Sequence, residues 1–154
     1  MPILLVLAGL PLLVNVDATV LNIALPILSR SLRSSTEELQ WAADDFTLMF
    51  ASWTLAGGSL GDRKGRARVW RGGVAVFSLA SLVAALSGSI GMLIGDRLVM
   101  GIGGAVASPA SLAILTNVFP DPGQRAKAVG VWVATGSAGQ LSAPVLGGLI
   151  PANF

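Results

Sequence analysis

The stretch GGVAVFSLASLVAALSGSIGMLIG, from Gly72 to Gly95, contains no charged side chain. A helical apolar run of about 20 residues matches a hydrocarbon core about 30 Å thick. Several such runs occur in the chain, in which 53% of the residues are hydrophobic and 12% are charged. A soluble domain normally has about 25% charged residues, which keep its surface in water. The sequence therefore predicts an all-α fold, a polytopic bundle of transmembrane helices.

Working outward from this stretch, apolar segments and the breaks between them predict five membrane helices, at about residues 3–28, 39–60, 69–86, 91–118 and 125–150. Ser35 and Glu38 have the spacing of a capping box, which marks the start of the second helix. We expect a tight basic turn over residues 61–68. The sequence PDPG at residues 120–123 breaks the chain before the fifth helix, because proline does not continue a helix.

Lysine and arginine are unevenly distributed among the predicted connections. The second connection and its flanks hold five of them, at positions 63, 64, 66, 68 and 71, and the fourth connection is followed by Arg125 and Lys127. The first connection holds only Arg30 and Arg33, offset by two glutamates. Because cytoplasmic loops are enriched in lysine and arginine, we expect the N-terminus and the second connection to be cytoplasmic.

Five charged residues lie beyond the first turn of the predicted helices. Each would cost about 2.5 to 3.5 kcal/mol at the bilayer centre. A position near the membrane interface, where the side chain can reach water, is a plausible explanation for Asp44, Asp45 and Asp96. It is less plausible for Asp17 and Arg97. At a rise of about 1.5 Å per residue, Asp17 and Arg97 lie at similar depth in the outer half of the membrane. We therefore predict that they face each other across the bundle, with Asp17 as a proton carrier.

Other polar and small residues indicate how the helices pack. Asn15, Thr19 and Asn22 share one face of the first helix, which predicts an inner helix that lines a cavity. Two glycine pairs, Gly57 with Gly61 and Gly91 with Gly95, have the GxxxG spacing that lets helices approach closely in lipid.

Several function classes are excluded. The chain has no cysteine and no histidine, which removes thiolate nucleophiles, the commonest general base, and zinc sites built on these ligands. The GxSxG pattern at residues 57–61 lacks the histidine base that a serine hydrolase needs. We expect no catalytic residues, no metal and no enzyme activity. The sequence pI of about 9.9 reflects orientation in the membrane better than nucleic-acid binding.

Four stretches in the first four predicted helices and their connections resemble motifs of the major facilitator superfamily. VDATVLNIALP at residues 16–26 looks like the first-helix motif of drug:proton antiporters. The segment GSLGDRKGRAR at 58–68 resembles the family's loop motif, with an alanine at position 67 where a basic residue is usual. RLVMGIGGA at 97–105 resembles the fourth-helix motif, with methionine in place of glutamine. WAADDFT at 41–47 looks like the start of the second helix in the fourteen-helix multidrug exporters.

The fifth helix carries a pattern similar to the family's antiporter motif, with one glycine replaced by alanine. The resemblance implies a proton-coupled exporter without a cofactor, driven by the proton gradient, in a bacterial cell membrane. The proton-coupling or cavity residues that it implies are Asp17, Asn22, Arg97 and Asp44. The implied inner gate comprises Gly58, Asp62, Arg63, Gly65 and Arg66. The implied antiporter motif, which limits proton leak, comprises Gly130, Gly139, Pro144, Gly147 and Gly148.

Members of this family have twelve or fourteen helices in two halves, so we interpret residues 1–154 as the N-terminal part of the first half of a transporter. The implied partners are lipid, protons, a small lipophilic substrate and the missing C-terminal helices. The alternative is a truncated, stand-alone small membrane protein that acts by helix association and does not transport.

Overall fold

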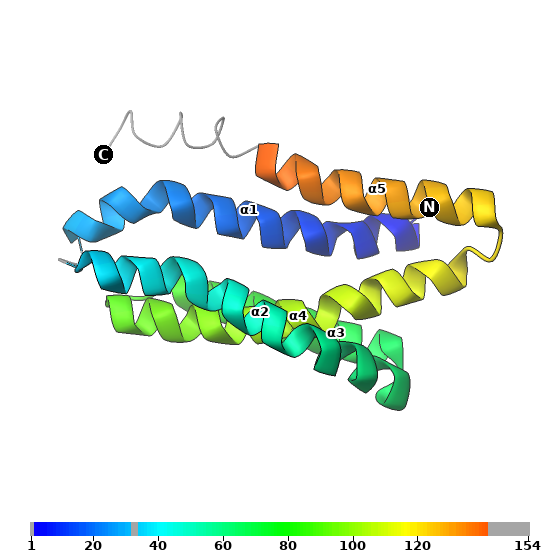
Figure 1. Cartoon of the computed structure of the whole chain (residues 1–154), viewed down its shortest axis with the longest axis horizontal. Helices are drawn as coiled ribbons and strands as arrows, with labels where there is room; N and C mark the ends of the chain where they lie inside the picture. The colour runs from blue at the N-terminus through cyan, green and yellow to red at the C-terminus, as the bar shows by residue number, and fades with distance from the viewer. Residues whose placement is uncertain (1, 32–33, 142–154) are drawn as a thin grey trace. The chain divides into compact units, whose positions relative to one another are not determined.

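The structure is a computed structural model that describes residues 2–31 and 34–141. Within these residues the chain forms five α-helices (Figure 1). They are α1 (Pro2–Ser31), α2 (Thr36–Lys64), α3 (Arg66–Ala85), α4 (Ile90–Val118) and α5 (Pro122–Leu141). The prediction of an all-α bundle is confirmed, and the part of the fifth predicted helix after Leu141 lies outside the described residues.

Three of these helices are long and apolar enough to cross a membrane: α1, α3 and α4. Within the described ranges, α2 and α5 do not meet the same measure of length and composition. Helix α2 has charged residues at both ends, with Glu37 and Glu38 in its first turn and Arg63 and Lys64 in its last.

The start of α2 is fixed by a capping box, as the sequence predicts. The Ser35 hydroxyl accepts a hydrogen bond from the Glu38 N–H at 3.2 Å, and the Ser35 N–H donates to Glu38 Oε2 at 2.8 Å. These bonds satisfy backbone donors that the helix leaves without an internal partner. The helix therefore begins at Thr36, before the position near residue 39 that its apolar pattern indicates.

The basic turn expected over residues 61–68 is much shorter in the structure. Helix α2 continues to Lys64 and α3 begins at Arg66, so Gly65 alone separates them. Gly65 has φ +92°, a backbone conformation that residues with a Cβ rarely adopt. A single glycine thus reverses the chain, and the basic residues expected in a loop lie on helix ends.

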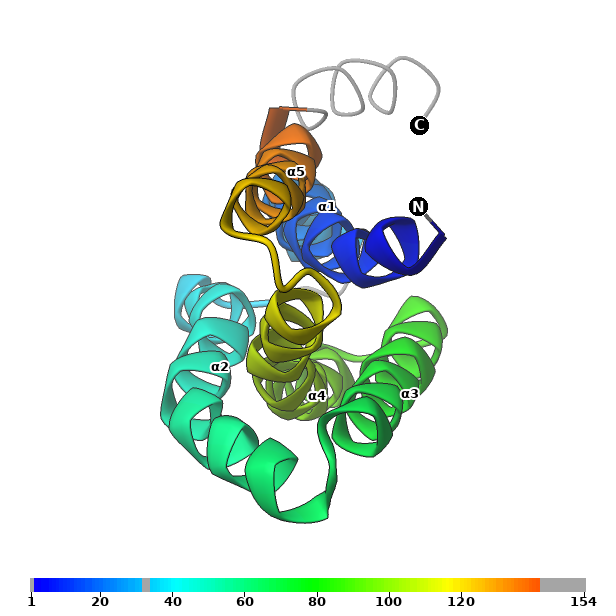
Figure 2. The same cartoon turned by 90° about the vertical axis from the view of Figure 1, so that its right-hand side faces the viewer.

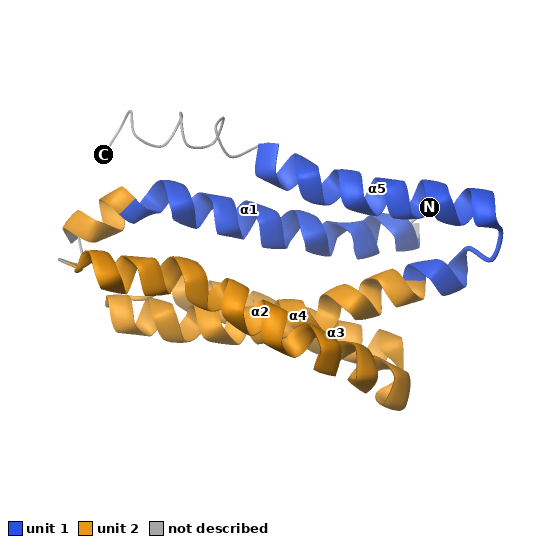
Figure 3. Ribbon diagram, viewed as in Figure 1, with its two compact units in different colours: residues 1–25, 115–154 blue, residues 26–114 orange. Residues whose placement is uncertain are grey.

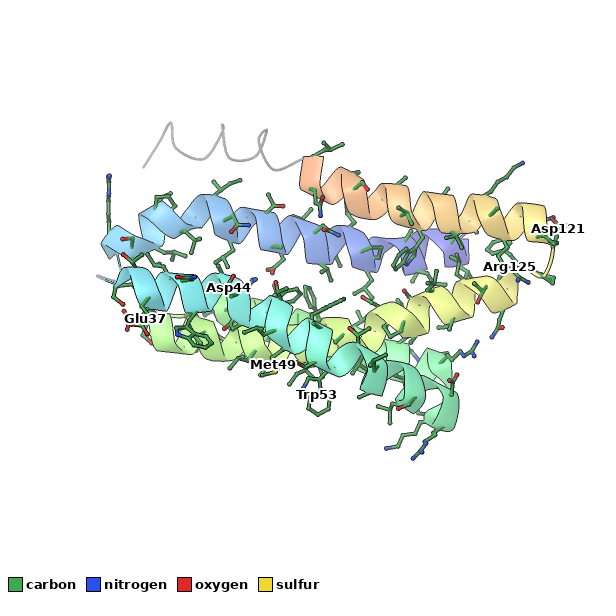
Figure 4. The ribbon with its side chains drawn as sticks, in the orientation of Figure 1. Glu37, Asp44, Met49, Trp53, Asp121 and Arg125 are labelled. Carbon is green, nitrogen blue, oxygen red and sulfur yellow. The ribbon has the colours of Figure 1, made fainter. Side chains whose placement is uncertain are left out.

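Helix α5 also begins earlier than expected, at Pro122. Proline fits the first position of a helix because its missing N–H would have no partner there. The Asp121 carboxylate accepts a hydrogen bond from the Gln124 N–H at 2.8 Å, and the Arg125 Nε donates to the Phe119 carbonyl at 3.1 Å. Figure 4 shows Asp121 and Arg125 at this turn. The PDPG sequence therefore breaks the chain before Pro122 and starts the next helix.

The chain divides into two compact units (Figure 3). Unit 1 comprises residues 1–25 and 115–154, and therefore most of α1 together with α5. Unit 2 comprises residues 26–114, with α2, α3 and most of α4.

In unit 2, α4 packs against both α2 and α3 through glycines (Figure 2). A Cβ placed on Gly101 would lie 2.7 Å from the Phe46 carbonyl oxygen, and one on Gly57 would lie 2.7 Å from the Val106 Cα. On the α3 side, a Cβ on Gly73 would lie 2.8 Å from the Gly103 carbonyl oxygen. Only glycine permits these backbones to approach so closely.

The two GxxxG pairs behave differently. Gly57 forms a close contact with α4, and a Cβ on Gly61 would meet the Arg66 side chain at 3.8 Å. For Gly91 and Gly95, no described atom lies within 4 Å of the place where a Cβ would stand. The interpretation of this second pair as a packing motif is therefore wrong for the described part of the chain. Spacing alone does not identify the helix face that meets a neighbour.

Candidate functional site

Unit 2 contains a buried pair of opposite charges. Asp45 on α2 and Arg97 on α4 are only 1% and 3% exposed. The Arg97 Nε lies 3.8 Å from Asp45 Oδ1, which makes an ion pair without the geometry of a close hydrogen bond. The Phe46 N–H donates to the same carboxylate oxygen at 2.6 Å. Buried charges are tolerated when they are paired, so this contact explains how both can lie inside a helical bundle.

An aromatic side chain also lies against Arg97. The Arg97 Cζ lies 5.0 Å from the centroid of the Phe46 ring, a cation–π distance. The Phe46 ring also contacts Phe50 on α2, with centroids 5.8 Å apart, and meets Phe77 on α3 edge-on at 6.5 Å. The guanidinium is therefore held by a carboxylate and a ring from the same turn of α2.

The spacing of the fourth-helix motif follows from this packing. Arg97, Gly101 and Gly104 are spaced i, i+4 and i+7, which places them on one face of α4. That face meets α2, because a Cβ on Gly101 would collide with the backbone of Phe46, and one on Gly104 would lie 3.3 Å from the Phe50 ring. The glycines thus allow the two helices to approach closely enough for Arg97 to reach Asp45 and Phe46.

The structure separates the two neighbouring aspartates of α2. Asp44, which the sequence nominates as a coupling residue, is exposed and lines a shallow groove with Glu37, Gln40, Trp41 and Leu48. Figure 4 shows Asp44 and Glu37 on this helix. Asp45 faces α4 instead, because successive residues on a helix point in different directions. The contact with Arg97 explains the burial of Asp45, and its depth relative to the membrane interface stays a prediction.

Sequence reasoning missed Asp45, although a signal was present. Ala42, Asp45, Phe46 and Met49 follow the helical repeat of a single face. Three of these residues are buried, and a Cβ on Gly101 would lie 2.8 Å from the Met49 Cβ. An aspartate within an otherwise apolar helix face, in phase with small residues on another helix, indicates a buried partner.

The first-helix residues lie in unit 1. Asp17 is partly buried, and Asn22 is exposed. The Asn15 carbonyl oxygen accepts a hydrogen bond from Gln140 of α5 at 2.9 Å, and the Asn15 amide donates to the Pro11 carbonyl at 2.8 Å. Because Asp17 and Arg97 belong to different units, the expected pairing between them stays a prediction.

The inner-gate residues lie around the junction of α2 and α3. The Arg66 guanidinium contacts the Asp62 carboxylate at 3.0 Å and donates to the Ala113 carbonyl of α4 at 3.2 Å. Gly65 makes the reversal between the helices, and Arg63 is exposed in the last turn of α2. No described atom lies within 4 Å of a Cβ placed on Gly58. Arg66 therefore joins three helices at one point.

Only the first part of the antiporter motif can be located. Gly139 of α5 packs on α1, where an added Cβ would lie 2.9 Å from both the Asn15 Cβ and the Leu12 carbonyl oxygen. Gly130 is exposed, with no described atom within 4 Å of an added Cβ. The motif residues at positions 144, 147 and 148 lie outside the described residues.

The sequence of the chain also matches the model of a known protein family. The model of the Major Facilitator Superfamily matches residues 7–154. The chain belongs to this family. The resemblance inferred from the four motifs is thereby confirmed, and members of this superfamily are multi-pass membrane transporters.

Curated members of the superfamily match nearly the whole chain. The methyl viologen resistance protein SmvA of Salmonella typhimurium is 41% identical over 152 residues, which cover 99% of this chain and 30% of SmvA. The multidrug efflux pump LfrA of Mycolicibacterium smegmatis is 37% identical, over 97% of this chain and 30% of LfrA. The methylenomycin A resistance protein of Bacillus subtilis is 39% identical, over 96% of this chain and 32% of that protein. The chain thus spans about three-tenths of the length of these superfamily relatives.

Proposed function

We propose that this chain forms the N-terminal helices of a proton-coupled exporter of drugs or small lipophilic compounds. The observation that carries the proposal is the ion pair between Asp45 and Arg97, buried among close-packed helices. Ionisable residues inside membrane helices are costly, and they mark ion and proton pathways. The names of the relatives, which describe drug efflux pumps and resistance proteins, support the direction of transport and a role in antibiotic resistance.

The proposal includes the energy source, the topology and the rest of the protein. The proton gradient drives export, and no cofactor is needed. The N-terminus and the junction of α2 and α3 face the cytoplasm, because the junction carries the densest cluster of basic residues. Further helices of the same transporter complete the substrate path, since transporter sites of this kind form between two halves near the membrane midplane.

In this exporter the junction of α2 and α3 acts as part of an inner gate. Arg66 contacts Asp62 through one side of its guanidinium and the Ala113 carbonyl through another. Such contacts tie the cytoplasmic ends of α2, α3 and α4 together in one state of the transport cycle. Release of these contacts in the alternate state would let the helices separate.

Replacing Arg66 by lysine tests the gate. Lysine keeps the charge, but it lacks the planar group that reaches two partners at once. We expect efflux to fall roughly tenfold or more, since hydrogen bonds to charged groups contribute about 1.5–3 kcal/mol each. The measurement is efflux of a fluorescent substrate, with Arg68→Lys as the matched control. Among the described residues, the exposed Arg68 side chain donates a hydrogen bond to the Lys64 carbonyl of its own turn and to no other helix. Equal efflux by the two variants would argue against the gate.

The function itself is tested with a chimera in which this chain replaces the matched 152 residues of SmvA. We expect the chimera to raise the resistance of a susceptible bacterium to methyl viologen several-fold, and a protonophore to abolish the effect. A fluorescent protein fused to the C-terminus reports insertion. The chain expressed alone serves as the control for a stand-alone role. A chimera that inserts at the level of SmvA but gives no protonophore-sensitive efflux contradicts the proposed function.

A further inference from the structure

The buried carboxylate of Asp45 is held from two sides within unit 2. Its Oδ1 accepts the short bond from the Phe46 N–H and faces Arg97. Its Oδ2 is also buried and accepts no hydrogen bond from the described residues. The hydrogen bond to Oδ1 therefore fixes the orientation of the Asp45 carboxylate, and the negatively charged carboxylate faces the Arg97 guanidinium on α4.

The position of Arg97 depends on the same turn of α2. The Phe46 ring lies against the guanidinium, and the Phe46 carbonyl oxygen lies where a Cβ of Gly101 would stand. Asp45 and Phe46 are adjacent in sequence, and Gly101 is one turn after Arg97. The close contact between the backbones of α2 and α4 thus sets the distance between Asp45 and Arg97. Their side chains need no large movement to come together.

This arrangement makes Asp45 part of the structure that holds Arg97 in place. We propose that Asp45 is a positioning residue, a fixed counter-charge that holds Arg97 at the interface of α2 and α4 during proton coupling. The inference rests on the proposed function. A guanidinium whose charge is balanced within its own helix pair stays in place when a titrating carboxylate elsewhere in the transporter gains or loses its proton. Asp45 thereby keeps Arg97 available to that carboxylate throughout the transport cycle.

Asp45→Asn in the chimera separates coupling from folding. The substitution keeps the size of the side chain and removes its charge. We expect proton-driven efflux to fall by roughly a hundredfold, since removing one partner of a buried ion pair leaves the other uncompensated. Equilibration of substrate down its own gradient, measured with a protonophore present, should stay close to that of the parent chimera, because it needs no coupling.

Two further variants sharpen the test. Asp45→Glu keeps the charge, so it should recover much of the proton-driven efflux. Glu37→Gln removes an exposed carboxylate from the same helix and is the matched control, with efflux expected to equal that of the parent chimera.

Three outcomes overturn the inference. Proton-driven efflux by Asp45→Asn at the parent level shows that the counter-charge is not needed. Loss of driven and downhill flux in parallel shows a structural role without a part in coupling. Failure of Asp45→Glu to recover more efflux than Asp45→Asn shows that the charge is not what matters. A parent chimera that inserts but does not export contradicts the proposed function instead, and this is measured before any variant.

Discussion

Asp17→Asn in the chimera is expected to abolish proton-driven efflux. Asparagine has the size of aspartate but cannot bind and release a proton near neutral pH, so a carrier at this position is lost. Asp17 lies in the part of α1 that also holds the Asn15 contact to α5, which places it on a helix that packs against α5. The measurement is resistance to methyl viologen together with efflux in energised cells.

The control for Asp17→Asn is membrane insertion, followed by fluorescence of the fused reporter. Insertion should be unchanged, because the substitution removes a charge from an apolar helix and does not add one. Asp17→Glu should retain part of the efflux, since it keeps a titratable carboxyl. Efflux by Asp17→Asn at the level of the parent would remove Asp17 from the coupling mechanism.

Gly73→Ala is expected to destabilise unit 2 strongly, although it adds only one methyl group. The new Cβ would lie 2.8 Å from the Gly103 carbonyl oxygen and 2.9 Å from the Ala107 N, and backbone atoms cannot move aside cheaply. Overpacking of this kind costs about 1–3 kcal/mol. We expect the melting temperature of the detergent-solubilised protein to fall by roughly 5–10 °C.

The neighbouring Gly72 provides the matched control. It is exposed on the same helix, and no described atom lies within 4 Å of an added Cβ. Gly72→Ala should therefore leave the melting temperature unchanged or raise it, because alanine favours a helix over glycine by up to about 1 kcal/mol. A lower melting temperature for Gly73→Ala and an unchanged or higher one for Gly72→Ala would demonstrate that α4 packs on the Gly73 face of α3. Equal melting temperatures for the two variants would contradict that packing.

The fourth-helix motif contains both the charged residue Arg97 and the glycines that pack against α2. Gly101 and Gly104 bring α2 close to α4, and this approach allows Arg97 to reach Asp45 and Phe46. The motif therefore combines a charge with the small residues that position it. A substitution at these glycines would disturb Arg97 without touching its side chain, so the charge and the glycines should be tested separately.

The sequence by itself determined the membrane class, the number of helical segments and their order. Long apolar runs have no stable place outside a bilayer or a core, and proline, glycine and capping residues act locally, so these signals can be read along the chain. Local signals also carried the family resemblance and the nomination of Arg97. They predicted the end of α2 and the start of α5 less accurately, because Gly65 and Pro122 allow these helices to extend up to the adjacent turn.

Only the tertiary structure decided which charge partners which. Asp44 and Asp45 are adjacent and chemically identical, yet one is exposed and the other is buried against Arg97. Their difference depends on the rotation of α2 about its axis, which is fixed by the fit of Phe46 and Met49 against Gly101. The same reason distinguishes Gly73 from Gly72 and Gly57 from Gly91. Residue type and spacing are properties of one helix, whereas the face that becomes buried is set by the helices packed against it.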